Sequence, residues 1–169
     1  YMGQVPVLFL SLKDVEGATF EAAYRVFASK IVVSAKRHAY LLDSPRLDDD
    51  DKVMLRKYQS RDVMRNLANI DIAADFLKNM LTFLAKHFDR QAMLFLDEYD
   101  VPLAKAASRG YYNLMRDFIR AFFAVLKPEA DFELYDRPFL KKTVLTGCLR
   151  VSKESIFTGV NNFSINTIC

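Results

Sequence analysis

The chain has 169 residues, 51% of them hydrophobic, so it can bury the core of one compact domain, and two independent domains are not expected. Its 24 Lys and Arg residues against 21 Asp and Glu residues leave a formal charge of +3 without a long basic block. This argues against a general nucleic-acid-binding surface and leaves a local basic site open. No apolar run approaches the roughly 20 residues that span a bilayer and no signal peptide is recognisable, so a cytoplasmic protein without membrane contact is expected.

The first half of the chain predicts one strand followed by helices. Residues 5–12 form a nearly continuous apolar run, which is typical of a strand buried on both faces of a parallel sheet. From Thr19, the expected N-cap, apolar residues recur at helical spacing until about Leu42. The acidic run at 48–52 is expected to begin a second helix, because carboxylates favour the positive end of the helix dipole. A further long amphipathic helix is expected after Asp71.

The second half predicts further strands and one more long helix. Residues 91–96 form another apolar run, and a wide helical stripe of apolar residues spans 111–126 and should pack in the core. Residues 141–148 are the third strand candidate and residues 162–168 are a fourth. Strands separated by helices predict a three-layer α/β fold with a mainly parallel sheet, in which the first three strand segments are neighbours.

Three acids follow the second strand candidate, in the stretch LFLDEYDVPL: Asp97, Glu98 and Asp100. In open parallel sheets, ligands gather beyond the carboxyl ends of the strands. An apolar strand followed by Asp-Glu is the pattern of a Walker B strand, in which the Asp holds Mg²⁺ through water and the Glu polarises an attacking water. Many strands also end in an acidic loop without catalytic function, and both interpretations stay open at this point.

The third strand candidate ends in VLTGCLR. In a parallel sheet, Thr146 lies where a polar side chain could contact a γ-phosphate, and Arg150 follows at a distance suited to stabilising phosphate charge. A strand-ending turn is the alternative for Thr146 and Gly147, and a surface ion pair is the alternative for Arg150. The side chains of Asp97, Glu98 and Thr146 should lie within roughly 10 Å of one another if these three residues act on the same phosphate.

The combination of LFLDEYDVPL, GYY, DFIRAFF and TGCLRVSKESIF resembles the bacterial AAA-ATPase-like domain, a P-loop NTPase family often followed by a PD-(D/E)XK nuclease-like domain. PVLFLSLKDVEGATFEAA looks like the second strand and helix of that domain, so the resemblance spans nearly the whole chain. It implies a sheet of the additional-strand class, with ATP and Mg²⁺ as ligands of the full domain. The residues and roles that it implies are Asp97 as the magnesium residue, Glu98 as the catalytic acid, Thr146 as an approximate sensor 1 and Arg150 as a candidate phosphate sensor. Tyr99 and Asp100 also match the family motif, without a role that spacing establishes; Asp100 could equally cap the loop at Pro102.

The chain lacks the Walker A loop that such a domain needs. GxxxxGK[ST] is absent, and none of the five glycines is followed by Lys. In the family this loop precedes the strand that corresponds to residues 5–12, so residues 1–169 look like a partial domain that begins after the loop. We therefore expect little ATP binding by this chain alone. The missing first strand would also leave sheet edges exposed, through which copies of the chain could associate.

Two other functions compete with an ATPase. A non-catalytic interaction module would use the acids for helix caps and a protein interface. A metal-dependent nuclease would use the three acids after the second strand, but the separated acid and Lys of a nuclease core are not evident, and DFELYDRPFLKK matches that pattern only superficially.

The histidines and cysteines do not indicate a metal site. His38 and His87 sit late in predicted helices, which favours a surface role near the negative end of the dipole. Cys148 and Cys169 lack metal-ligand spacing, which favours reduced thiols.

Overall fold

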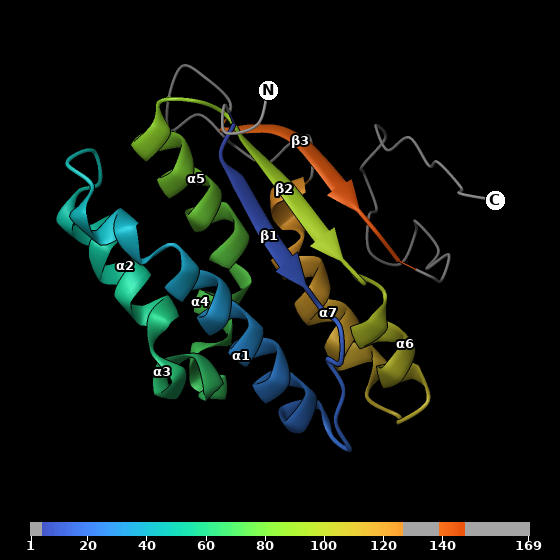
Figure 1. The fold of residues 1–169 in the computed structure, drawn as a ribbon. Helices are drawn as coiled ribbons and strands as arrows, with labels where there is room; N and C mark the ends of the chain where they lie inside the picture. The colour runs from blue at the N-terminus through green and yellow to red at the C-terminus, as the bar shows by residue number, and fades with distance from the viewer. Residues whose placement is uncertain (1–4, 127–138, 148–169) are drawn as a thin grey trace.

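The structure is a computed structural model that describes residues 5–126 and 139–147. Its sheet has the strand order β1-β2-β3, and both neighbouring pairs are parallel (Figure 1). The strands are β1 (Val7–Ser11), β2 (Ala92–Asp97) and β3 (Leu140–Leu145). The predicted neighbourhood of the first three strand segments is therefore confirmed, whereas residues 162–168 lie outside the described residues.

Helices fill the connections between the strands. Those between β1 and β2 are α1 (Phe20–Arg37), the 3₁₀ turn η1 (Ala39–Asp43), α2 (Asp49–Gln59), α3 (Arg61–Arg65), η2 (Leu67–Asn69), α4 (Ile70–Ala74) and α5 (Phe76–Phe88). Those that follow β2 are α6 (Val101–Ala107), α7 (Tyr112–Phe122) and η3 (Ala124–Leu126). The helix expected after Asp71 is divided in two at Asp75. Helix α6 was not predicted from the sequence; it carries Pro102 in its first turn, where a missing N–H breaks no helical hydrogen bond.

Side-chain caps explain where α1 and α2 begin. The Thr19 hydroxyl accepts a hydrogen bond from the Ala22 N–H at 3.3 Å, as predicted. At the start of α2, the Asp48 carboxylate accepts from the Asp51 N–H at 2.9 Å, and the Asp51 carboxylate accepts from the Asp48 N–H at 3.4 Å. This reciprocal capping box confirms that the acidic run begins a helix.

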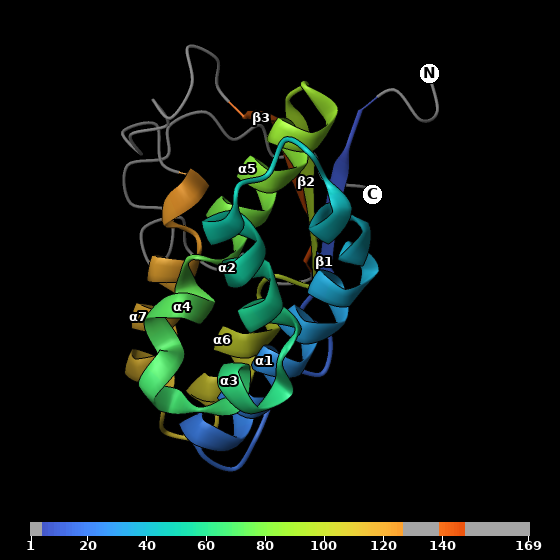
Figure 2. The ribbon, with the colours of Figure 1, turned by 90° about the vertical axis from the view of Figure 1, so that its left-hand side faces the viewer.

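The helices cover one face of the sheet. On that face Leu8 and Leu94 are fully buried beneath α1 and α5, whereas Val7 and Phe9 on the opposite face are 42% and 45% exposed. Figure 2 shows the sheet nearly edge-on, with α4 and α7 on the same side of it. The described residues therefore form two layers, and the third layer that the sequence predicted is not found among them.

Aromatic contacts hold α7 against α1. The ring centroids of Phe27 and Phe118 are 4.9 Å apart and those of Phe27 and Phe122 are 4.8 Å apart, both in edge-to-face geometry. The aromatic stripe on α7 is core, as predicted, although Leu114 at 57% exposure lies outside it. None of the described helices has the length and apolarity that crossing a bilayer requires.

Candidate functional site

The ends of the three strands meet at one edge of the sheet. Ser11 pairs in register with Asp97 across β1 and β2, and Thr146 follows β3 directly. Backbone hydrogen bonds continue the pairing past the strands, from the Leu12 N–H to the Asp97 carbonyl at 2.8 Å and from the Thr146 N–H to the Leu96 carbonyl at 2.9 Å. These backbone hydrogen bonds therefore hold the polar side chains at the ends of the neighbouring parallel strands next to one another, at one edge of the sheet.

The carboxylate of Asp97 is held from both sides. The Thr146 hydroxyl donates to Oδ1 at 2.6 Å, and the Ser11 hydroxyl donates to Oδ2 at 3.1 Å. The predicted proximity of Asp97 and Thr146 is confirmed. Sequence reasoning missed Ser11, although one signal was available: it is the polar residue that interrupts the apolar run 5–12 near its end, as Asp97 ends the apolar run of its own strand.

Glu98 has an unusual backbone conformation. Its φ is +52°, in the left-handed region that residues with a Cβ rarely occupy. That conformation costs a non-glycine residue about 1 kcal/mol, and such strain is concentrated at functional sites. It turns the chain out of β2 immediately after Asp97. The side chain of Glu98 is half-buried, and in the described part of the chain no hydrogen bond or ion pair engages its carboxylate.

The loop after β2 packs against the end of β3. Asp100 is 1% exposed, and a Cβ added at Gly147 would lie 2.5 Å from its Oδ1 and 2.9 Å from Cε1 of Tyr99. Gly147 is therefore needed for this close approach. Burial raises the pKa of Tyr99, and the charge of Asp100 raises it further. Asp100 stands at the N-cap of α6, but its side chain makes no capping hydrogen bond, so its proposed role as a side-chain cap near Pro102 is wrong.

At this edge the described residues offer a potential metal ligand in Asp97 but no complete set of protein ligands. The described residues contain no cluster of three or more His, Cys, Asp or Glu side chains that could hold a metal ion. His38 lies 2.9 Å from the Ser34 carbonyl through Nδ1, and His87 lies 2.8 Å from the Ser44 hydroxyl, so each ring is engaged near its helix end. One carboxylate of fixed orientation suits Mg²⁺, which is usually bound by one or two carboxylates together with water and substrate phosphates.

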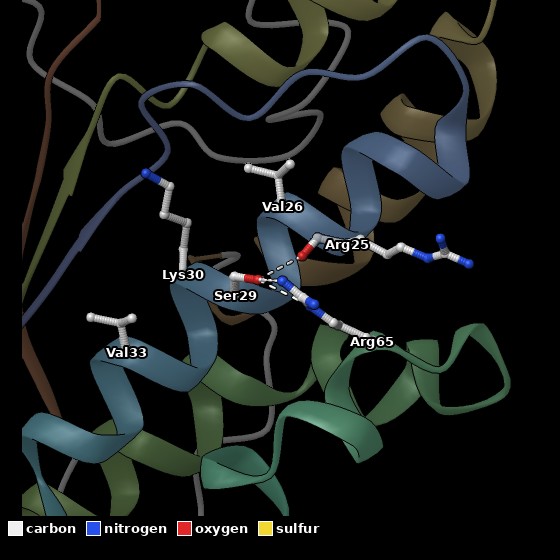
Figure 3. A pocket seen from close by; sticks show the side chains of 6 residues that line it. All are labelled: Arg25, Val26, Ser29, Lys30, Val33 and Arg65. Carbon is white, nitrogen blue, oxygen red and sulfur yellow. Dashed lines mark hydrogen bonds between the residues drawn. The ribbon is translucent and has the colours of Figure 1, made fainter.

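A shallow hollow of about 380 Å³ lies elsewhere, on the outer face of α1 (Figure 3). Its lining side chains are Arg25, Val26, Ser29, Lys30, Val33 and Arg65. The Ser29 hydroxyl accepts from Nε and Nη2 of Arg65 at 3.3 and 3.0 Å and donates to the Arg25 carbonyl at 2.9 Å (Figure 3). None of these residues ends a strand or carries a carboxylate. The strand-end cluster is therefore the better candidate for metal chemistry.

Comparison with known proteins identifies a family. A family model described as predicted AAA-ATPase matches residues 1–157, a range that includes all three strands and the cluster at their ends. No curated protein and no solved structure matches the chain. Arg150, Cys148 and Cys169 lie outside the described residues.

Proposed function

Because the chain belongs to the predicted AAA-ATPase family, we propose that it is part of a domain that binds and hydrolyses ATP with Mg²⁺. The observation that carries this proposal is the Asp97 carboxylate, held at the end of β2 by hydroxyls from both neighbouring strands. In that position a carboxylate can bind the water shell of a cation without direct metal contact. Nucleotide state would then be coupled to a partner or to a C-terminal domain.

Each residue of the cluster has a distinct role in this proposal. Bound Mg²⁺ would neutralise charge on the phosphates. Asp97 would hold the water shell of the metal, and Glu98 would orient the attacking water and accept its proton. Arg150 is the candidate that stabilises phosphate charge.

Thr146 has a conditional role. Its hydroxyl has a single hydrogen, which is donated to Asp97 in this structure. Thr146 cannot donate to Asp97 and to a phosphate oxygen at the same time. A sensor role therefore requires Thr146 to release Asp97 when the γ-phosphate is bound.

The phosphate cradle is the part that the printed sequence does not contain. We place it upstream, in a longer protein, on a strand that would pair with β3. Two observations support this placement: the sequence has no GxxxxGK[ST], and β3 lies at an edge of the described sheet. The chain alone should accordingly show little ATP binding.

Substitution of Glu98 tests the catalytic part of the proposal. In a protein extended upstream through the Walker A loop, Glu98→Gln should leave ATP bound and slow hydrolysis by about 10²-fold, because the amide cannot accept the proton. Asp117→Asn on α7 is the matched control, since its exposed carboxylate pairs with Arg116. Phosphate release and nucleotide titration measure the two effects.

Substitution of Asp97 tests the magnesium part. Asp97→Asn should weaken the Mg²⁺-dependent component of ATP binding and leave the metal-free component unchanged. An upstream sequence without a Walker A loop, or normal hydrolysis by Glu98→Gln, would instead support a non-catalytic interaction module.

A further inference from the structure

The Ser11 hydroxyl is oriented by its own turn. The Lys13 N–H donates to Ser11 Oγ at 3.3 Å, while Ser11 Oγ lies 3.1 Å from Oδ2 of Asp97. Because Lys13 occupies a lone pair of the hydroxyl, the hydroxyl hydrogen is left to point at the carboxylate. The turn after β1 is also fixed, since Leu12 and Val15 are fully buried and the Val15 N–H bonds the Leu12 carbonyl at 3.2 Å.

The bond between Ser11 and Asp97 is not needed to pair the strands. The backbone of β1 is already joined to that of β2 through the Leu12 N–H and the Asp97 carbonyl at 2.8 Å. The hydrogen bond between the side chains instead fixes the orientation of the Asp97 carboxylate. With one neutral donor on each oxygen, the plane of the carboxylate is set. A neutral donor brings no positive charge that would compete with a cation, and each oxygen keeps a lone pair for a metal-bound water.

We propose that Ser11 is a positioning residue that orients the Asp97 carboxylate for Mg²⁺ binding. This inference rests on the proposed function. Ser11 and Thr146 differ in that role, because Thr146 must release Asp97 in order to contact a phosphate. Ser11 is the donor that stays on the carboxylate in the nucleotide-bound state, so its removal affects the metal-bound state most.

The first test uses the chain itself with Mn²⁺ as the probe. Paramagnetic broadening of the backbone amide signal of Asp97 should need about tenfold more Mn²⁺ in Ser11→Ala than in the unsubstituted chain, a loss typical of removing a group that orients a metal ligand. Ser11→Thr keeps the hydroxyl and should restore the original Mn²⁺ dependence. Ser29→Ala, which removes a hydroxyl from the hollow on α1, is the control and should leave the broadening unchanged.

The second test uses the protein extended upstream through the Walker A loop. The Mg²⁺ concentration for half-maximal ATP binding should rise about tenfold in Ser11→Ala, with the metal-free ATP affinity and the unfolding temperature unchanged. Equal losses of binding with and without Mg²⁺ would show a structural role and overturn the inference. If Asp97→Asn shifts the Mg²⁺ dependence and Ser11→Ala does not, this inference alone fails. If neither shifts it, the magnesium assignment in the proposed function fails as well.

Discussion

Tyr24 and Tyr58 both have fully buried side chains, but their hydroxyl groups differ in hydrogen bonding. The Tyr58 hydroxyl accepts a hydrogen bond from Nδ2 of Asn79 at 2.7 Å, whereas the Tyr24 hydroxyl has no hydrogen-bond partner among residues 5–126 and 139–147. Burial raises the pKa of Tyr24 to about 12 and also raises the pKa of Tyr58 above its ordinary value. The two residues therefore form a matched pair, in which the same substitution should have opposite effects on stability.

Tyr24→Phe should raise the free energy of unfolding by about 1 kcal/mol, because it removes a buried hydroxyl that lacks a hydrogen bond. Tyr58→Phe should lower the free energy of unfolding by about 1 kcal/mol, because it leaves the Asn79 amide without its acceptor. Urea denaturation of both variants and of the unsubstituted chain measures the difference. A loss of stability in Tyr24→Phe would show that the hydroxyl is satisfied in solution.

The same substitution should change the alkaline limit of stability. The phenol of Tyr24 ionises near its ordinary value of 10 in the unfolded chain and only near 12 in the folded chain. The folded state thus binds more protons between these values, so stability falls as the pH rises through this window. Tyr24→Phe should make the fall shallower, as measured by denaturation at pH values from 9 upward. An unchanged slope would contradict this assignment.

At the scale of elements, the acidic residues that cap α2 also form ion pairs with a lysine on α5. Nζ of Lys86, on α5, lies 2.5 Å from Oδ2 of Asp51 and 3.5 Å from Oδ2 of Asp48, and the Lys86 side chain is only 8% exposed. The hydrogen bond from the Asp51 backbone and then the interactions with Lys86 hold the pKa of Asp48 below its ordinary value. The capping box thus also supplies the charge that a buried lysine requires, and it joins α2 to α5.

Asp51→Asn should lower the free energy of unfolding by about 2 kcal/mol, because it removes the nearer of the two carboxylates that contact the buried Lys86 ammonium and leaves Asp48 at 3.5 Å. Asp49→Asn is the control, since Asp49 lies in the same acidic run and is exposed, and its loss should cost less than about 1 kcal/mol. Thermal denaturation of both variants checks the difference. Equal effects of the two substitutions would show that Asp51 makes no specific contribution to the stability of the buried Lys86.

Local sequence patterns predicted most of the helices and strands. The features of the site that they missed depend on the pairing of strands far apart in the sequence. The caps of Thr19 and Asp48 were predictable because each involves only its own helix. The hydrogen bond from Ser11 to Asp97 was not, because it joins residues 86 positions apart and depends on the register of β1 against β2. The positive φ of Glu98 was also missed, since an Asp-Glu pair carries no signal for left-handed backbone.

At the scale of the whole molecule, the two edges of the described sheet differ. At the β1 edge the Ser34 hydroxyl, 3% exposed, donates to the Phe9 carbonyl at 3.4 Å, so α1 satisfies an outward-facing acceptor. At the other edge two of the six residues of β3, Lys141 and Lys142, are exposed. This asymmetry favours the β3 edge for an additional strand, from upstream sequence or from a second copy of the chain.

The two faces of the sheet should contribute differently to stability, and substitutions at neighbouring residues of β1 measure the difference. Leu8→Ala should lower the free energy of unfolding by about 2 to 5 kcal/mol, because it removes a fully buried side chain. Phe9→Ala should cost much less, because its ring is 45% exposed. Denaturation of the two variants gives both values. A similar cost for Phe9→Ala would show that a further layer or partner covers that face.

The sequence distance between the partners of Asp97 has a consequence for how the protein forms during synthesis. Ser11 precedes Asp97 by 86 positions, whereas Thr146 follows it by 49. At translation rates of about 5 to 20 residues per second, Thr146 is made about 2 to 10 s after Asp97. During that interval Ser11 is available to the carboxylate and Thr146 is not. In a nascent chain the Asp97 carboxylate is therefore oriented from one side first, and the second donor arrives only when β3 joins the sheet.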